Sequence, residues 1–536
     1  MGDWTLRPHA TLRPPEGPVV FVVMDGVGVA PAGEGNAVRL ARTPCLDRLA
    51  DEALTTTLRA HGTAVGLPSD DDMGNSEVGH NAIGAGRVFD QGAKLVDLAI
   101  DSGALFHGDT WRWVTGGGTL HLIGLLSDGN VHSHERHLHA LIRAARAGGV
   151  ARVRVHVLLD GRDVSAQSAL IYVDRLEAVF AEAGGDCRIA SGGGRMLVTM
   201  DRYESDWRVV ERGWHAHVLG DARRFPSARA AIETFRAEAP DLIDQWLPPF
   251  VVDPPSPIQD GDGVVLFNFR GDRALQISRA FEADDFRPFD RVRRPAVRYA
   301  GMMRYDGDAG VPERFLVTPP SIDHTFGELL ARGGAAQWAC SETQKYGHVT
   351  YFWNGNRTGC FDADVETYLE VPSDRVPFEQ RPWMKAAEVT DAALAAIASG
   401  RHRLCRLNYA NGDMVGHTGD LRAAILAVEA VDLCLARLAN AVAAAHGVLL
   451  VTADHGNADE MLQCDKKTGG LLRGKDGRTV VSTSHSLNPV PLYVTGAPVG
   501  WRLRGGGGLS NLAATTLELM GYAAPSEYDP SLLITP

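Results

Sequence analysis

The feature that most constrains the fold is a repeated alternation of short apolar runs with segments of helical periodicity. The first run reads Val-Val-Phe-Val-Val-Met, within a strand predicted at 18–24, and a predicted helix follows at 38–53. This alternation is typical of α/β proteins, because parallel strands need long crossover connections that are usually helical. We predict further strands at 120–127, 153–159, 263–267, 296–302, 404–408, 448–453 and 490–494, and further helices at 136–147, 167–183, 322–332, 385–399 and 421–444.

Two candidate seams divide the chain. Its 536 residues suggest about two to four domains. A glycine-rich stretch at 84–92 and a proline-containing segment at 317–320 bracket a middle block that has strands and helices of its own. A block of this kind is tolerated as an insertion when its two chain connections lie close together. We therefore predict one domain made of residues 1–90 and 319–536, and a second, inserted domain at 91–318.

Composition narrows the class of partner. Hydrophobic residues make up 45% of the chain, which is ample for a buried core, and the net charge is −13. A net acidic chain lacks the basic field that nucleic acids and anionic membranes require. Seven scattered cysteines without a Cys-x-x-Cys pair indicate neither a disulfide framework nor a thiolate zinc site. The first 17 residues include charges and three prolines in place of an apolar signal segment. We expect a cytoplasmic protein that binds small molecules and neither nucleic acid nor membrane.

Acidic residues follow three of the predicted strands. Asp25 and Asp454 come directly after apolar runs, and Asp413 comes shortly after another. Because the carboxyl ends of parallel strands meet at one edge of a sheet, we expect these side chains to lie close together. Histidines accompany them in Asp413-Met-Val-Gly-His417 and in Asp454-His455-Gly456-Asn457, and a further one is His485. Gly456 is expected to turn the chain so that both Asp454 and His455 reach one point.

Carboxylates and imidazoles without cysteine suit Mn²⁺, Zn²⁺ or a similar divalent ion, and two such sets suit a pair of ions. The alternative is structural. Aspartates at strand ends often cap helices, and buried histidines often only satisfy their own hydrogen bonds. The gathering of several ligand-type residues at strand ends favours the metal interpretation.

The second signal is the segment Met73-Gly-Asn-Ser-Glu-Val-Gly-His80. A serine at the start of a helix is usually a cap, but Ser76 is flanked by Gly74 and Gly79, which we expect to leave room for a substrate. Helix-start amides stabilise a phosphate. A serine hydroxyl becomes a nucleophile when a base or metal removes its proton. Ser76 is therefore a candidate nucleophile.

These segments together resemble one enzyme family. The motifs at 25–28, 73–80, 160–163, 408–417 and 452–459 are similar, in order, to those of the cofactor-independent (2,3-bisphosphoglycerate-independent) phosphoglycerate mutases. The resemblance extends over nearly the whole chain. It implies membership of the alkaline phosphatase superfamily. The implied fold is an alkaline-phosphatase-like three-layer α/β/α domain, with both chain ends and the metals, plus an inserted α/β phosphotransferase domain.

The resemblance also implies residue roles. It places one metal on Asp413, His417 and His485, and the other on Asp25, Ser76, Asp454 and His455, with Ser76 becoming phosphoserine. Lys345 would reach the phosphate from the phosphatase side, and Asp163 would carry protons for the glycerate hydroxyls. The implied substrate-binding residues are His132, Arg162, Asp163, Arg195, Arg202, Arg270, Arg273 and Lys345. Arginine suits this task because its guanidinium binds carboxylates and phosphates in a bidentate manner.

The implied activity is the interconversion of 3-phosphoglycerate and 2-phosphoglycerate by an isomerase of glycolysis and gluconeogenesis. It would need two divalent ions, Mn²⁺ first among Mg²⁺, Co²⁺ and Zn²⁺, and no bisphosphoglycerate; the protein would be a monomer. Two alternatives stay open. A phosphomonoester hydrolase or another phosphosugar mutase would share the metal and serine motifs but not the middle-block arginines. A non-catalytic phosphoglycerate-binding protein would be expected to lack Ser76 or a metal ligand.

Overall fold

The computed structural model describes residues 4–67, 70–90, 92–201, 206–305, 310–318, 322–463, 470–473 and 477–536. The chain divides into two compact units, the first formed by residues 1–91 and 321–536 and the second by residues 92–320. The second unit is thus inserted in the sequence of the first. Each unit has its own hydrophobic core.

The first unit is built on a seven-stranded sheet with the order β12-β11-β13-β2-β14-β15-β3. The strands from β12 to β14 are parallel, and β15 is antiparallel to both of its neighbours. The central strand β2 is completely buried, as its uninterrupted apolar sequence predicts. The strands are β1 (Arg7–Pro8), β2 (Val19–Met24), β3 (Leu54–Leu58), β11 (Gln337–Glu342), β12 (Glu366–Val371), β13 (Leu404–Tyr409), β14 (Val448–Thr452), β15 (Val490–Thr495), β16 (Arg502–Leu503), β17 (Tyr522–Ala523) and β18 (Leu533–Ile534).

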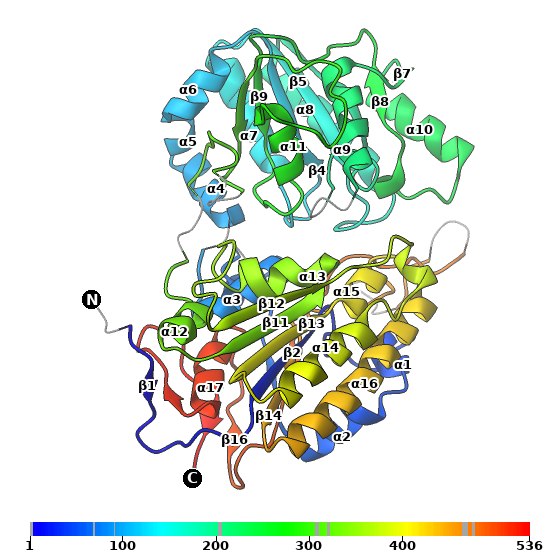
Figure 1. Ribbon diagram of the computed structural model, residues 1–536. Helices are drawn as coiled ribbons and strands as arrows, with labels where there is room; N and C mark the ends of the chain where they lie inside the picture. Colours follow the sequence, from blue (N-terminus) through cyan, green and yellow to red (C-terminus); the bar gives the residue numbers. More distant parts are fainter. Residues whose placement is uncertain are drawn as a thin grey trace. The chain divides into compact units, whose positions relative to one another are not determined.

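Helices cover both faces of this sheet, and α14 and α16 pack side by side on one of them (Figure 1). The single helix predicted at 38–53 is wrong, because Thr43-Pro44 interrupts it and Pro44 starts a new helix. The helical segments are α1 (Ala37–Leu40), α2 (Pro44–Glu52), η1 (Gly62–Val65), α3 (Ser76–Ala85), α12 (Phe326–Arg332), α13 (Thr343–Gly347), η4 (His348–Phe352), η5 (Phe378–Gln380), α14 (Ala386–Ala398), α15 (Asn411–Gly416), α16 (Leu421–Ala444) and α17 (Asn511–Leu519).

The second unit has a seven-stranded sheet of its own, with the order β10-β9-β4-β5-β6-β8-β7. The five strands from β10 to β6 are parallel, and β8 runs antiparallel to β6. Its strands are β4 (Leu120–Leu126), β5 (Arg152–Leu159), β6 (Asp186–Gly194), β7 (Arg223–Phe225), β8 (Phe250–Val252), β9 (Gly263–Leu266) and β10 (Arg298–Gly301). The helical segments are α4 (Gly92–Asp101), α5 (Ala104–His107), α6 (Asp109–Thr115), α7 (Glu135–Ala147), α8 (Ala169–Ala183), α9 (Trp207–Trp214), η2 (His215–Leu219), α10 (Ala228–Glu238), η3 (Asp244–Trp246) and α11 (Leu275–Glu282).

All eight predicted strands are present within a few residues of their expected bounds. Four strands of five or more residues were not predicted, namely β3, β6, β11 and β12. No helix in the described part of the chain has both the length and the apolar character needed to cross a membrane.

Candidate active site

The predicted ligand-type residues of the first unit come together at one edge of its sheet. Strands β13, β2 and β14 are parallel neighbours. Asp25 directly follows β2, Asp413 lies in α15 after β13, and Asp454 and His455 follow β14. All four are buried, the most exposed of them by only 2%. The loop after β2 is tight, because Gly26 has φ of +75° and a Cβ there would lie 2.5 Å from the Asp413 backbone nitrogen.

Three side chains form the first cluster. Asp413 Oδ1 lies 2.9 Å from His417 Nε2 and 3.2 Å from His485 Nε2, and the two Nε2 atoms are 3.1 Å apart. His417 Nδ1 donates to the Thr483 carbonyl at 2.5 Å, and His485 Nδ1 donates to the Gly74 carbonyl at 2.7 Å. Because a carbonyl oxygen can only accept, both Nδ1 atoms carry protons. The Nε2 atoms of both rings therefore face the Asp413 carboxylate, and in the neutral form of the rings these atoms would offer a metal ion two nitrogens and one carboxylate oxygen.

A second cluster surrounds the candidate nucleophile. Ser76 Oγ lies 3.1 Å from Asp25 Oδ1 and 2.9 Å from His455 Nε2. His455 Nε2 is 3.4 Å from Asp25 Oδ1 and 3.7 Å from Asp454 Oδ2. Asp454 Oδ2 is buried and lies 3.3 Å from His80 Nδ1, although the geometry of this contact is not that of a hydrogen bond. A buried carboxylate oxygen of this kind is costly unless it faces a cation.

Both clusters fit a divalent ion by their spacing and chemistry. Donor atoms about 2.0–2.2 Å from a common ion lie roughly 3.0–3.5 Å apart at tetrahedral or octahedral angles. Most of the separations above fall close to that range. Within the described chain, two groups could hold a metal ion, Asp413 with His455 and His485, and Asp25 with Asp454 and His455. The resemblance assigns His455 to only one of the two ions, whereas in the structure His455 belongs to both groups.

Lys345, on α13, is the resident cation of the site. Its Nζ donates to Asp25 Oδ1 at 2.6 Å and to Asp413 Oδ2 at 2.7 Å, and it also contacts Ser76 Oγ. The side chain is 1% exposed. The lysine therefore connects the serine with carboxylates of both clusters.

The charges of the site stabilise one another. Burial alone would raise the pKa values of Asp413 and Asp454, but His417 and Lys345 beside Asp413, and His455 and His80 beside Asp454, hold both pKa values below the usual range. Burial alone would lower the pKa of His455, but the Asp454 carboxylate, with Asp25 and Asp413, raises it to about 9. The site therefore keeps Asp413 and Asp454 ionised, and these carboxylates attract positive charge.

Ser76 is the first residue of α3 and does not cap it. Asn75 is the cap, and its Oδ1 accepts from the amides of Glu77 at 3.1 Å and Val78 at 3.2 Å. The Ser76 hydroxyl does not cap the helix and instead contacts Asp25 and His455 of the second cluster. The glycines expected to admit substrate make room for the protein itself, since a Cβ on Gly74 would lie 1.9 Å from the Ala60 carbonyl oxygen. Similarly, a Cβ on Gly79 would lie 2.8 Å from the Asp454 carbonyl oxygen.

Two asparagines that orient this site had no predicted role. Asn408 Nδ2 donates to Asp25 Oδ2 at 2.8 Å, and Asn457 Nδ2 donates to Asp413 Oδ1 at 3.2 Å. His80 Nδ1 donates to the Ser76 carbonyl at 2.8 Å. Hydrogen-bond partners of this kind fix the orientation of side chains that bind metal ions. Gly456 is required for close packing, because a Cβ there would lie 2.2 Å from Ser486 Oγ.

The predicted substrate residues of the second unit follow β4, β5, β6 and β9, which are parallel neighbours in its sheet. Arg195 is 1% exposed, and its Nη1 donates to Asp160 Oδ1 at 2.9 Å and also to Asp163 Oδ2. Arg162 follows in the same turn, where Asp160 Oδ1 accepts from the amides of Arg162 and Asp163. Burial and the nearby Asp163 raise the pKa of Asp160, whereas Arg195 opposes that rise.

A second group in this unit is organised by Asp272. Its Oδ1 lies 3.5 Å from His132 Nδ1 and 3.1 Å from Arg270 Nε. Arg273 Nη1 donates to the Met200 carbonyl at 2.8 Å. Asp160 and Asp272 had no predicted role. The Asp-Gly turn in Asp160-Gly161-Arg162-Asp163 is a signal that could have identified Asp160. The predicted Arg202 lies outside the described residues.

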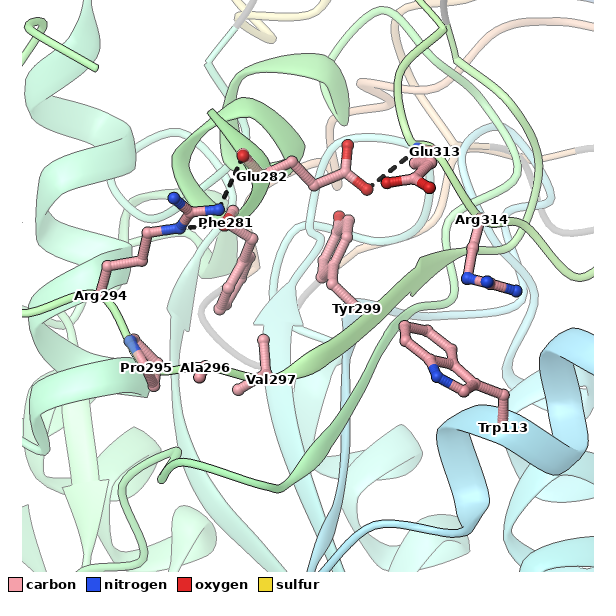
Figure 2. Close-up of a pocket in the computed structure, with 10 residues that line it drawn as sticks. All are labelled: Trp113, Phe281, Glu282, Arg294, Pro295, Ala296, Val297, Tyr299, Glu313 and Arg314. Atoms are coloured by element: carbon pink, nitrogen blue, oxygen red, sulfur yellow. Dashed lines mark hydrogen bonds between the residues drawn. The ribbon is translucent and has the colours of Figure 1, made fainter. Parts of the chain in front are cut away.

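A cavity of about 530 Å³ in the second unit contains none of the predicted site residues. Figure 2 shows its lining, where the Glu282 carboxylate accepts a hydrogen bond from the Glu313 amide and the Arg314 guanidinium lies near the ring of Trp113. Burial raises the pKa of Glu282 to about 7, against the effect of that amide.

This raised pKa predicts a pH-dependent stability. Glu282 binds its proton more tightly in the folded protein, so its contribution to stability is complete below its ordinary pKa of 4.5 and is lost as the pH rises through about 7. We expect Glu282→Gln to be more stable than the wild type by about 1 kcal/mol above pH 7, after allowance for solvent screening. The gain should fade toward pH 4.5. Urea denaturation from pH 4.5 to pH 8 measures it, and a gain that does not vary with pH would contradict this account.

Comparison with known proteins agrees with the geometry. The model of the Metalloenzyme superfamily matches residues 17–524, so the chain is a member of that superfamily. It is 54% identical to the 2,3-bisphosphoglycerate-independent phosphoglycerate mutase of Trypanosoma brucei brucei over 99% of each chain. It is 49% identical to the 2,3-bisphosphoglycerate-independent phosphoglycerate mutase 1 of Arabidopsis thaliana, over 99% of this chain and 98% of the other.

A solved phosphoglycerate mutase from Leishmania mexicana is similar in structure, with a TM-score of 0.97 and 52% sequence identity over 99% of this chain and 100% of that one. The chain therefore belongs to the 2,3-bisphosphoglycerate-independent phosphoglycerate mutase family and is an isomerase. The predicted family, the enzyme class and the two-domain α/β fold are confirmed.

Proposed function

We propose that the protein interconverts 3-phosphoglycerate and 2-phosphoglycerate through a phosphoserine at Ser76, without bisphosphoglycerate. One observation carries the proposal. Ser76 Oγ lies within hydrogen-bond distance of Lys345 Nζ, His455 Nε2 and Asp25 Oδ1 in a buried, acidic cluster. A hydroxyl that donates to a carboxylate and contacts a lysine ammonium group is placed for nucleophilic attack. Family membership supports the choice of substrate.

The clusters described above would hold two divalent ions, with Mn²⁺ as the proposed ion. Asp413, His417 and His485 would hold one, and Asp25, Ser76, Asp454 and His455 the other, with His455 also within reach of the first group. When bound, such ions lower the pKa of a serine hydroxyl and neutralise phosphoryl oxygens. The protein groups that orient the ligands are Asn408, Asn457, Thr483 and Gly74.

The first unit, which corresponds to the domain predicted at 1–90 and 319–536, would carry out phosphoryl transfer. Ser76 Oγ gives its proton to the Asp25 carboxylate, to which it donates a hydrogen bond, and attacks the phosphorus of 3-phosphoglycerate, and the bond between phosphorus and the C3 oxygen breaks. Lys345 Nζ stabilises the negative charge on the transferring group. The phosphoryl group then resides on Ser76, and glycerate is the leaving group.

The second unit, which corresponds to the inserted domain predicted at 91–318, would bind the glycerate and transfer its protons. His132, Arg162, Arg195, Arg202, Arg270 and Arg273 would bind its carboxylate and hydroxyl groups. Arg195 Nε supports this role, because it is buried and has no hydrogen-bond partner among the described residues. Asp163 would protonate the C3 oxygen as it leaves and then remove the proton from the C2 hydroxyl, which attacks the phosphoserine. The bond between phosphorus and Ser76 Oγ breaks, Asp25 returns the proton to the serine oxygen, and the product is 2-phosphoglycerate.

We further propose a monomeric, cytoplasmic enzyme. Its net charge of −13 gives no basic surface for nucleic acid, and its reaction requires only a small substrate.

The test is ³¹P NMR of 3-phosphoglycerate incubated with the Mn²⁺-loaded protein, without bisphosphoglycerate, and quenched before recording. We expect a 2-phosphoglycerate signal that disappears after the protein is treated with a chelator and returns when Mn²⁺ is added back. Inorganic phosphate as the sole product would mean that water accepts the phosphoryl group, and a hydrolase would replace the mutase. Tight binding without turnover would favour a non-catalytic protein.

A further inference from the structure

A chain of hydrogen-bonded side chains crosses the core of the second unit and has no part in the mechanism above. It begins at Asp262, passes through three histidines and a serine, and ends at Thr199. The contacts are Asp262 Oδ2 to His121 Nε2 at 3.1 Å, His121 Nδ1 to His156 Nε2 at 2.9 Å, His156 Nδ1 to Ser191 Oγ at 2.7 Å, Ser191 Oγ to His217 Nδ1 at 2.7 Å, and His217 Nε2 to Thr199 Oγ1 at 3.0 Å.

These hydrogen-bonded side chains lie between the sheet and a helical segment that packs on it. His121, His156 and Ser191 belong to the adjacent strands β4, β5 and β6, and His217 belongs to η2. These four residues and Thr199 are at most 1% exposed. A buried polar network of this length is stable only when every member is satisfied. Removing one member should therefore disturb the other hydrogen bonds of this network.

The contacts allow only one direction for the hydrogen bonds. Asp262 accepts from the amides of Thr119 and Gln259 as well as from His121, and its pKa lies below the usual value, although burial alone would raise it. Burial lowers the pKa values of His121 and His156, and lowers that of His217 to about 3, so all three rings are neutral.

A neutral ring donates from one nitrogen and accepts at the other. Starting from the Asp262 carboxylate, His121 and His156 must carry their protons on Nε2, and Ser191 donates to His156. His217 must then carry its proton on Nδ1. Thr199 Oγ1 is the donor at the end of the chain, and its partner is His217 Nε2.

Thr199 has an unusual backbone. Its φ is +68°, a conformation that β-branched residues rarely adopt and that costs about 1–3 kcal/mol. The Thr199 amide donates to the Val209 carbonyl at 2.8 Å, and its hydroxyl lies against α9. Gly213 of α9 provides the space, because a Cβ there would lie 2.0 Å from Thr199 Oγ1. The hydrogen bond to His217 is thus one of a few contacts that hold a strained turn.

This turn positions two of the proposed substrate residues. The turn lies at the end of a loop that begins at Arg195. The Arg195 amide donates to the Leu159 carbonyl at 3.0 Å. The next residue, Met200, accepts at its carbonyl from Arg273 Nη1 at 2.8 Å. A change in the Thr199 backbone would therefore move the acceptor that orients Arg273.

We propose that Thr199 and His217, supported by the chain from Asp262, are positioning residues that hold the loop from Arg195 to Met200, and with it Arg273, in the geometry for binding phosphoglycerate. The inference rests on the proposed function of these arginines. None of the residues in this hydrogen-bonded network needs to touch the substrate, because they act by holding the loop from Arg195 to Met200 in place.

The test compares three threonine variants in the full-length, Mn²⁺-loaded enzyme. Thr199→Val keeps the shape but removes the donor, and we expect its KM for 3-phosphoglycerate to rise about five- to tenfold with kcat changed less than about twofold. Thr199→Ser keeps the donor and should restore the wild-type KM. Thr234→Val is the matched control, because Thr234 in α10 of the same unit also donates one hydrogen bond, to the Ala230 carbonyl. An unchanged KM in Thr199→Val, with lowered thermal stability alone, would overturn the proposal.

Two further measurements separate this inference from the proposed function. Calorimetric binding of 3-phosphoglycerate does not depend on turnover, so the same five- to tenfold ratio of dissociation constants should appear even if the wild type proves inactive. A wild type that neither binds nor converts 3-phosphoglycerate would overturn both. ¹⁵N NMR of labelled histidines, assigned with His217→Gln, should show His217 as the Nδ1–H tautomer and His121 and His156 as Nε2–H. Any other pattern would contradict the direction of the chain.

Discussion

Replacing Ser76 with alanine is expected to lower mutase turnover by at least about 10⁴-fold, because the change removes the proposed acceptor of the phosphoryl group. The change removes one oxygen that contacts Lys345, His455 and Asp25. The α3 cap on Asn75 is unaffected, so the fold should be preserved, with a Tm within a few degrees of the wild type. The measurement is the initial rate of 2-phosphoglycerate formation, with circular dichroism melting of the same sample.

Ser510→Ala is the control for this prediction. Ser510 is a buried serine of the same unit that donates to the Asp529 carboxylate and has no contact with the candidate site. It should keep wild-type turnover. Mass spectrometry of the wild type quenched during turnover should find phosphate on Ser76 and on no other serine. Appreciable turnover in Ser76→Ala would refute the phosphoserine mechanism.

The sequence predicted the parallel strands because they are uninterrupted apolar runs, which burial on both faces requires. It failed where packing takes precedence over composition. Strand β6 ends in Gly192-Gly193-Gly194, a glycine run that weakens any strand prediction. In the structure, a Cβ on Gly192 would lie 2.6 Å from the Val157 carbonyl oxygen. The neighbouring strand β5 thus leaves no space for a side chain, a fact that only the folded structure reveals.

The predicted ligands of the first unit lie together because topology alone brings the ends of β2, β13 and β14 to one edge. The residues that orient them were not predictable in the same way. Asn408 is the penultimate residue of β13, and its contact with Asp25 depends on the register of β13 with β2, in which Asn408 pairs with Val23. Similarly, Asp272 lies between two predicted arginines, and only the folded loop shows that it contacts Arg270 and His132.

The second large effect is expected for Lys345→Met. Lys345 Nζ lies between Asp25 Oδ1 at 2.6 Å and Asp413 Oδ2 at 2.7 Å and also contacts Ser76 Oγ, so its charge is placed where the transferring phosphoryl group gains negative charge. Removing a preorganised charge of this kind lowers kcat by about 10²–10³-fold. Binding of Mn²⁺ should not weaken, because the carboxylates lose a competing cation. The measurements are kcat with saturating 3-phosphoglycerate and calorimetric titration with Mn²⁺.

A lowered kcat together with Mn²⁺ binding that is not weakened distinguishes a catalytic lysine from a structural one. A lysine that only balanced the charges of Asp25 and Asp413 would, when removed, leave kcat unchanged once Mn²⁺ is saturating. Lys385→Met is the matched control, because Lys385 of the same unit also pairs with two carboxylates, Asp374 at 2.9 Å and Glu388 at 3.3 Å. It should change neither quantity. Wild-type kcat with weaker Mn²⁺ binding in Lys345→Met would show that the lysine supports the fold of the site and not the transfer of the phosphoryl group.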